Sequence, residues 1–72
     1  MKHKIGDVVK IRSDLEIGHK YNMEGFETGD IVVSGMLNLL GKTVTIVSVS
    51  NDENPCYYVN DSIYCWTDEM FE

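Results

Sequence analysis

KTVTIVSVSNDENPCYYVNDSIYCW, residues 42–66, is the stretch from which the fold is predicted. Its first part alternates β-branched residues with a period of two, which is typical of a half-buried strand. A cluster of turn formers at residues 51–55 then stops this strand, because its proline cannot join a sheet ladder. Pairing resumes at residues 56–59 and, after a tight turn, returns through residues 62–66. The stretch therefore predicts three consecutive antiparallel strands.

The two-residue loop at positions 60 and 61 sets the register of the last two strands. It places Tyr57 opposite Tyr64 and Cys56 opposite Cys65. Counted outward from the turn, the cysteine pair occupies a non-hydrogen-bonded position, where Cα atoms come within about 4.5 Å of each other. We therefore expect the two thiols to be neighbours.

The rest of the chain predicts a small, mainly all-β barrel. Residues 4–12 alternate apolar and charged side chains and predict a first strand. Residues 13–30 break this periodicity with three glycines, so a long loop is expected there, ordered by docking its apolar side chains on the barrel. Apolar spacing in residues 31–40 predicts one or two helical turns, and Thr67 can cap another. Five short strands with one long early loop are the plan of a single SH3-like barrel domain over residues 1–72.

The length of the chain, 72 residues, limits how much core it can build. A domain of this size buries only about 60% of its unfolded surface and gains from a metal, a disulfide or a partner. No apolar run is long enough for a membrane span, and residues 1–11 lack the hydrophobic core of a signal peptide. We therefore expect a cytoplasmic protein. In a reducing compartment, two cysteines do not indicate an obligatory disulfide framework.

Charge is distributed unevenly along the chain. Residues 1–12 carry four basic side chains and one acidic one, a balance of +3, whereas residues 13–72 carry two lysines and eleven carboxylates, a balance of −9. A surface this acidic repels nucleic-acid phosphates and attracts basic clefts. A simpler explanation is that the negative charge keeps the protein soluble and serves no partner.

Four stretches of the chain form a pattern that is shared with known proteins. They are KIGDVVKIRSDL at residues 4–15, GKTVTI at 41–46, YYV at 57–59 and WTDEMFE at 66–72. They resemble a group of small proteins encoded by phages and prophages of low-GC Gram-positive bacteria, and WTDEMFE is the most specific of them. The resemblance implies a small SH3-like β-barrel without an assigned activity. Proteins of this size, acidity and origin include anti-CRISPR inhibitors. The cysteine pair is not part of the family pattern, which leaves a specialised role open.

Two cysteines and two histidines could together form a zinc site. Cys56 and Cys65 would supply neighbouring thiolates and His3 or His19 imidazole nitrogens, which are ligands that zinc prefers. A marginal domain would gain folding free energy directly from such a metal. Two alternatives remain open: free buried thiols, because cysteine is among the most buried residue types, and a cross-strand disulfide.

Aromatic residues near the hairpin point to a different kind of partner. Tyr57, Tyr58, Tyr64 and Trp66 could stack the bases of a single-stranded nucleic acid, as on other barrel folds. The carboxylates around them have the wrong charge for the basic groove that such a site needs. Two histidines and scattered serines assemble no nucleophile, base and orienting residue, so an enzyme is not expected.

The sequence thus favours a non-enzymatic inhibitor or interaction protein. Its acidic face would occupy the basic, nucleic-acid-handling surface of a host protein, with a CRISPR effector such as Cas9 as one candidate. The residues expected to contact this partner, eight carboxylates and two tyrosine anchors, are Glu24, Glu27, Asp30, Asp52, Glu53, Asp61, Asp68, Glu69, Tyr57 and Tyr64. The alternatives are a structural or regulatory phage protein and a nucleic-acid-binding barrel that uses Lys2, Lys4, Lys10 and Arg12.

Overall fold

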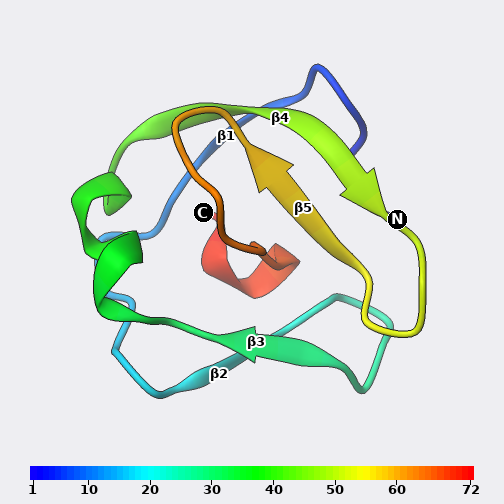
Figure 1. The fold of residues 1–72 in the computed structure, drawn as a ribbon, viewed down its shortest axis with the longest axis horizontal. Helices are drawn as coiled ribbons and strands as arrows, with labels where there is room; N and C mark the ends of the chain where they lie inside the picture. The colour runs from blue at the N-terminus through cyan, green and yellow to red at the C-terminus, as the bar shows by residue number, and fades with distance from the viewer.

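Three strands form the larger of two antiparallel sheets in the computed structural model, which describes residues 1–72 (Figure 1). They are β1 (Val8–Lys10), β4 (Thr43–Ser50) and β5 (Cys56–Val59), and β4 lies between the other two. Along β4 the side chains of Val44 and Ile46 are buried, while Val47 is exposed. The predicted half-buried strand in this part of the chain is thereby confirmed.

A second sheet consists of only two antiparallel strands, β2 (Lys20–Asn22) and β3 (Gly29–Ile31). Most of this hairpin lies where the sequence pattern predicts a loop, and that prediction is wrong because strands of three residues are too short to show a period of two. The turn between the strands uses Gly25, whose φ of +83° is accessible to glycine at no steric cost. Tyr21 is buried, as the expected docking requires, whereas Phe26 is exposed.

Residues 62–66, predicted to be the last strand, contain one isolated bridge instead. Trp66 pairs with Tyr57, so the register differs by two residues from the predicted pairing of Tyr57 with Tyr64. The hydroxyl oxygen of Ser62 accepts hydrogen bonds from the Tyr64 amide (3.2 Å) and from the Trp66 indole nitrogen (3.0 Å). These bonds fold the segment before Trp66 into a compact loop, which accounts for the shifted register.

Two 3₁₀ turns, η1 (Ser34–Leu39) and η2 (Asp68–Met70), lie where helical turns are predicted. The side chain of Thr67 does not cap η2 as expected; its hydroxyl donates instead to the carbonyl oxygen of Tyr21, at 2.9 Å. This hydrogen bond ties the segment around η2 to β2. Neither turn is long and apolar enough to cross a lipid bilayer.

One hydrophobic core of 15 buried residues joins the two sheets. Its side chains come from β1, β2, β4, β5 and both 3₁₀ turns. Figure 1 shows η2 (red) between the three-stranded sheet and the β2–β3 hairpin. Trp66 and Met70 are both 0% exposed, so residues 66–72, hereafter the C-terminal segment, supply part of the core.

We predict that Gly35→Ala destabilises the fold. A Cβ atom at this position of η1 would overlap the ring of Tyr64, which packs directly against the glycine. Overpacking of this kind costs about 1–3 kcal/mol of unfolding free energy, which urea unfolding followed by circular dichroism measures. The double variant Gly35→Ala/Tyr64→Leu should be about as stable as Tyr64→Leu alone, because the obstructing ring is gone. A full additional loss in the double variant would contradict the contact.

Candidate functional site

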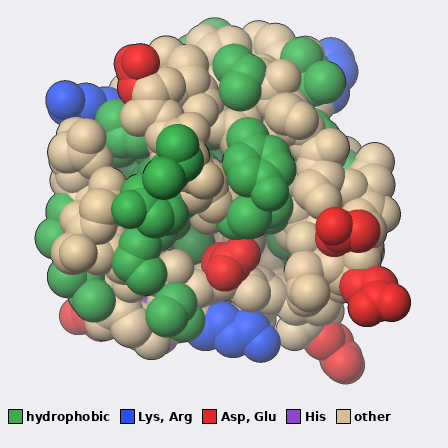
Figure 2. Space-filling model, viewed as in Figure 1, with side chains coloured by type: hydrophobic (Ala, Val, Ile, Leu, Met, Phe, Trp, Pro, Cys, Tyr) green, Lys and Arg blue, Asp and Glu red, His purple; other side chains and the backbone are tan.

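Eight residues from β3, the end of β4, β5 and the segments beside them line a surface hollow of about 480 Å³. They are Asp30, Ser50, Asp52, Glu53, Asn54, Cys56, Tyr58 and Cys65. Three of them are carboxylates and none is Lys or Arg, so we call this site the acidic hollow. Figure 2 shows acidic side chains gathered along one edge of the molecule, on the side where Figure 1 places the loop between β4 and β5. A broad group of hydrophobic side chains lies on the left and centre of the same face.

The two cysteines are neighbours in the acidic hollow, as the hairpin predicts, although the register differs. Both are free thiols, Cys56 buried and Cys65 half-buried. The Cys65 thiol donates a hydrogen bond to the Tyr58 hydroxyl, with Sγ and Oη 3.4 Å apart. Burial, together with the adjacent Cys65 thiol, raises the pKa of Cys56 to about 12. Cys56 is therefore protonated at neutral pH and is a weak nucleophile.

The two histidines do not line the acidic hollow. His3 lies between two carboxylates, with its Nδ1 3.8 Å from Asp7 and its Nε2 3.9 Å from Asp68. His19 packs on Tyr21, with the ring centroids 4.6 Å apart. No three His, Cys, Asp or Glu side chains meet in a group that could hold a metal ion. The structure therefore does not assemble the expected four-residue zinc set, and zinc binding by the cysteine pair stays a prediction.

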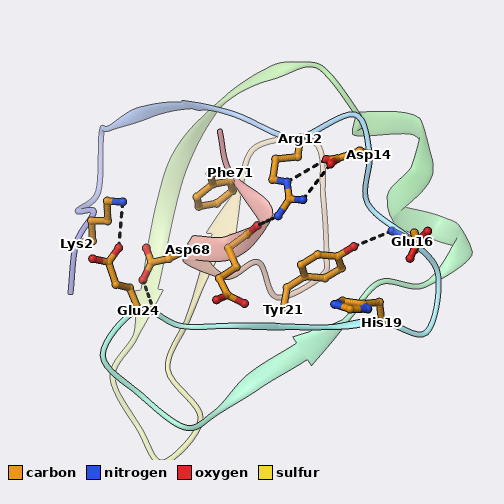
Figure 3. A pocket seen from close by; sticks show the side chains of 10 residues that line it. Lys2, Arg12, Asp14, Glu16, His19, Tyr21, Glu24, Asp68 and Phe71 are labelled. Carbon is orange, nitrogen blue, oxygen red and sulfur yellow. Dashed lines mark hydrogen bonds and ion pairs between the residues drawn. The ribbon is translucent and has the colours of Figure 1, made fainter.

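A second depression, the groove in Figure 3, has a volume of about 840 Å³ and is lined by side chains of both charges. Its basic side chains pair with acidic ones: Lys2 Nζ lies 3.0 Å from a carboxylate oxygen of Glu24, and Arg12 Nε lies 3.0 Å from one of Asp14. The hydrogen bond from Arg12 lowers the pKa of Asp14 below its usual value. These pairs compensate two of the five carboxylates in the lining, so the groove also keeps an excess of negative charge, from Glu16, Asp68 and Glu69; it differs from the acidic hollow in that it contains basic side chains.

Asp68 lies in the wall of this groove, but it is a buried structural group and not a free charge. Its carboxylate accepts hydrogen bonds from the Tyr57 hydroxyl at 2.8 Å and from the Glu24 amide at 3.0 Å (Figure 3 shows Asp68 and Glu24 side by side). Only 7% of Asp68 and 0% of Tyr57 is exposed. The expectation that these two residues contact a partner is therefore wrong, because the fold uses both to connect its own segments.

Glu69 and Tyr64, also expected at the partner surface, make contacts within the protein. Glu69 Oε1 accepts a hydrogen bond from the Asn22 amide at 2.8 Å. Tyr64 is half-buried against Gly35. Glu69 is otherwise exposed and Tyr64 partly so, and neither lies in the lining of the acidic hollow, so their contact with a partner stays a prediction.

The remaining expected contact residues are exposed or half-buried carboxylates. Glu24 pairs with Lys2, whereas Glu27 and Asp61 have no basic side chain within ion-pair distance. Asp30, Asp52 and Glu53 come together in the acidic hollow, where no basic side chain compensates them. This cluster is the part of the predicted acidic face that the structure assembles.

Tyr58 and Arg12 make contacts that differ from the base stacking and nucleic-acid binding expected of them. Tyr58 lies in the acidic hollow next to the thiols, and its shared parity with Cys56 along β5 was a usable signal. Arg12 donates to the Glu69 carbonyl oxygen at 2.8 Å and lies over Tyr21, 5.5 Å from the ring centroid. No local pattern predicts these contacts of Arg12, because the residues involved are far apart in sequence.

Comparisons with known proteins give no match. No protein-family model, no curated protein and no solved structure matches the chain. The case for a function therefore rests on the residues of the acidic hollow and their surroundings.

We predict that Asp68→Asn destabilises the fold by about 1–3 kcal/mol, the range for losing hydrogen bonds to a buried charged acceptor. The control is Glu16→Gln, which removes the same charge from an exposed side chain and should change stability by less than about 0.5 kcal/mol. Urea unfolding of both variants at pH 7 gives the comparison. Equal stability of the two variants would show that Asp68 does not connect the segments around it.

Alkaline pH is predicted to destabilise the protein through Tyr57. Burial raises the pKa of this phenol from 10.0 to about 12. Because the folded state holds the proton more tightly than the unfolded chain does, the contribution is fully present below pH 10 and is lost as pH rises through about 12. The expected loss is up to about 2–3 kcal/mol of unfolding free energy.

Urea unfolding between pH 8 and pH 12 tests this dependence. Tyr57→Phe should be less stable at pH 8, because it lacks the hydrogen bond to Asp68, but its stability should fall less steeply with pH. Cys56 adds a slope of the same sign in both proteins, because its pKa is raised from 9.0 to about 12. Parallel pH profiles for the two proteins would rule out the proposed role of the Tyr57 proton.

Proposed function

We propose that the chain is a small, non-enzymatic interaction protein that inhibits a nucleic-acid-handling host protein by covering its basic surface. A CRISPR effector such as Cas9 is the candidate partner. The observation that carries the proposal is the grouping of Asp30, Asp52 and Glu53 around one hollow without a single basic side chain. Three carboxylates with no Lys or Arg in the same lining give the hollow a field of one sign.

The charge of the hollow fits a surface that normally binds phosphates. Nucleic-acid-binding proteins present Lys and Arg side chains that neutralise phosphate groups. Carboxylates arranged on a protein surface can bind the same Lys and Arg side chains. Electrostatic complementarity of this kind speeds association and disfavours wrong partners. The net charge of −6 acts in the same direction over a longer range.

Direct binding of nucleic acid by the N-terminal basic residues has less support. Three of the four lie within 4 Å of a carboxylate oxygen, in the pairs Lys2–Glu24 (3.0 Å), Lys10–Glu72 (3.7 Å) and Arg12–Asp14 (3.0 Å). Exposed pairs are individually weak, but each would have to be replaced by a phosphate contact. The acidic role is therefore the better supported of the two.

We propose further that the two sheets are an SH3-like barrel of the phage-protein type, acting as one domain in the cytoplasm of a bacterial host. The order of short strands and 3₁₀ turns supports this assignment. The resemblance is most specific in the C-terminal segment, where Trp66, Thr67 and Met70 are all 0% exposed. Because these positions are buried, similarity there supports a shared fold but does not require a shared partner.

The triple variant Asp30→Asn/Asp52→Asn/Glu53→Gln tests the proposed function. Inhibition of DNA cleavage by guide-loaded Cas9 is measured at low and at moderate salt. The wild-type protein should inhibit, and more weakly as salt rises; the triple variant should need at least about tenfold more protein, equivalent to about 1.4 kcal/mol, and should be less sensitive to salt.

The matched control is Asp14→Asn/Glu16→Gln/Glu72→Gln, which brings the net charge from −6 to −3 as the triple variant does but leaves the acidic hollow intact. This variant should inhibit nearly as well as the wild type. If both variants lost inhibition equally, the effect would be due to net charge and not to the acidic hollow. The proposed function is wrong if two results are found together: the wild-type protein does not inhibit Cas9, and it binds no host protein that added DNA can displace from it.

A further inference from the structure

The two thiols of the acidic hollow stand on segments that only one β-bridge connects. Cys56 belongs to β5, and Cys65 belongs to the compact loop that returns along it. The bridge between Tyr57 and Trp66 puts Cys65 opposite Tyr58, on the face of β5 that also carries Cys56. Both sulfurs therefore line the same hollow.

The two cysteines differ in their access to solvent. Cys56 is only 2% exposed, whereas Cys65 is half-buried at the surface of the hollow. Its burial therefore shelters the Cys56 sulfur from an oxidant in solution. When an accessible thiol is oxidised to a sulfenic acid next to a second, sheltered thiol, the second thiol can react with it to form a disulfide.

We infer that Cys56 and Cys65 are a reversible oxidation site, in which Cys65 reacts first with a peroxide and Cys56 then closes an intrachain disulfide. In the first step the Cys65 sulfur bonds to a peroxide oxygen, the O–O bond breaks, and one water leaves with the thiol proton. In the second step the Cys56 sulfur attacks the sulfenic acid of Cys65, the S–O bond breaks, and a second water takes up the Cys56 proton. Two thiols are oxidised and one hydrogen peroxide is reduced to two waters.

The surroundings of the pair suit such a bond. Residues 62–65 lie outside any regular strand, so Cys65 can make the small adjustment that disulfide geometry requires. The new link would close a short loop and fasten the segment before Trp66 to β5. In a reducing compartment a disulfide of this kind is transient, which fits a redox response better than a permanent structural role.

Hydrogen peroxide is the probe for this inference. The reduced protein is treated with peroxide, and thiol counting, intact mass and non-reducing peptide mapping follow the product. Both thiols should disappear together with the loss of two hydrogens, and dithiothreitol should restore them. The thermal unfolding midpoint should rise by about 10 °C in the oxidised protein, since short-loop disulfides stabilise small domains.

Cys65→Ser is the principal variant, because Cys65 is half-buried and tolerates the change better than the buried Cys56. Its remaining thiol should react with peroxide at least tenfold more slowly than the wild-type pair. Tyr58→Phe removes the hydroxyl that contacts Cys65 and should still form the disulfide. Three results would each overturn the inference. They are addition of oxygen without a link between the cysteines, a disulfide between two chains, and oxidation of Cys65→Ser as fast as that of the wild type. So would zinc on the pair, found by elemental analysis of protein purified without added metal.

Discussion

The buried carboxylate of Asp68 connects parts of the chain that are distant in sequence. It accepts hydrogen bonds from Tyr57 on β5 and from the Glu24 amide in the β2–β3 hairpin, and the His3 ring faces it from the N-terminal segment. Removing a carboxylate from water costs free energy unless such partners satisfy it. Because the partners come from both sheets, the bonds that satisfy the charge also determine how the sheets face each other.

Two groups of acidic residues in this protein therefore have different surroundings. Those of η2 are used inside the molecule: Asp68 is buried, and Glu69 accepts the amide hydrogen bond of Asn22. Those around the acidic hollow have no basic side chain beside them in its lining. Net charge alone does not distinguish the two groups, so the predicted contact surface included Asp68, which is buried.

Features that depend on neighbouring residues could be predicted from the sequence. The alternation along β4, the turn of η2 and the proximity of Cys56 to Cys65 follow from local patterns. The burial of Asp68 could not be predicted, because it depends on hydrogen bonds to residues 44 positions away in one case and 11 in the other. The β2–β3 hairpin was missed for a related reason: its three-residue strands are recognisable only once they pair.

The place of the C-terminal segment in the core has a consequence for biosynthesis. Trp66 and Met70 are completely buried, and Phe71 pairs with Ile11 near the other end of the chain. During translation the ribosome releases β1 and β4 before the residues of this segment, so the apolar faces of the two strands emerge uncovered. Until residues 66–71 follow, the apolar faces of these strands lack their native cover, and exposed apolar surface of this kind favours aggregation.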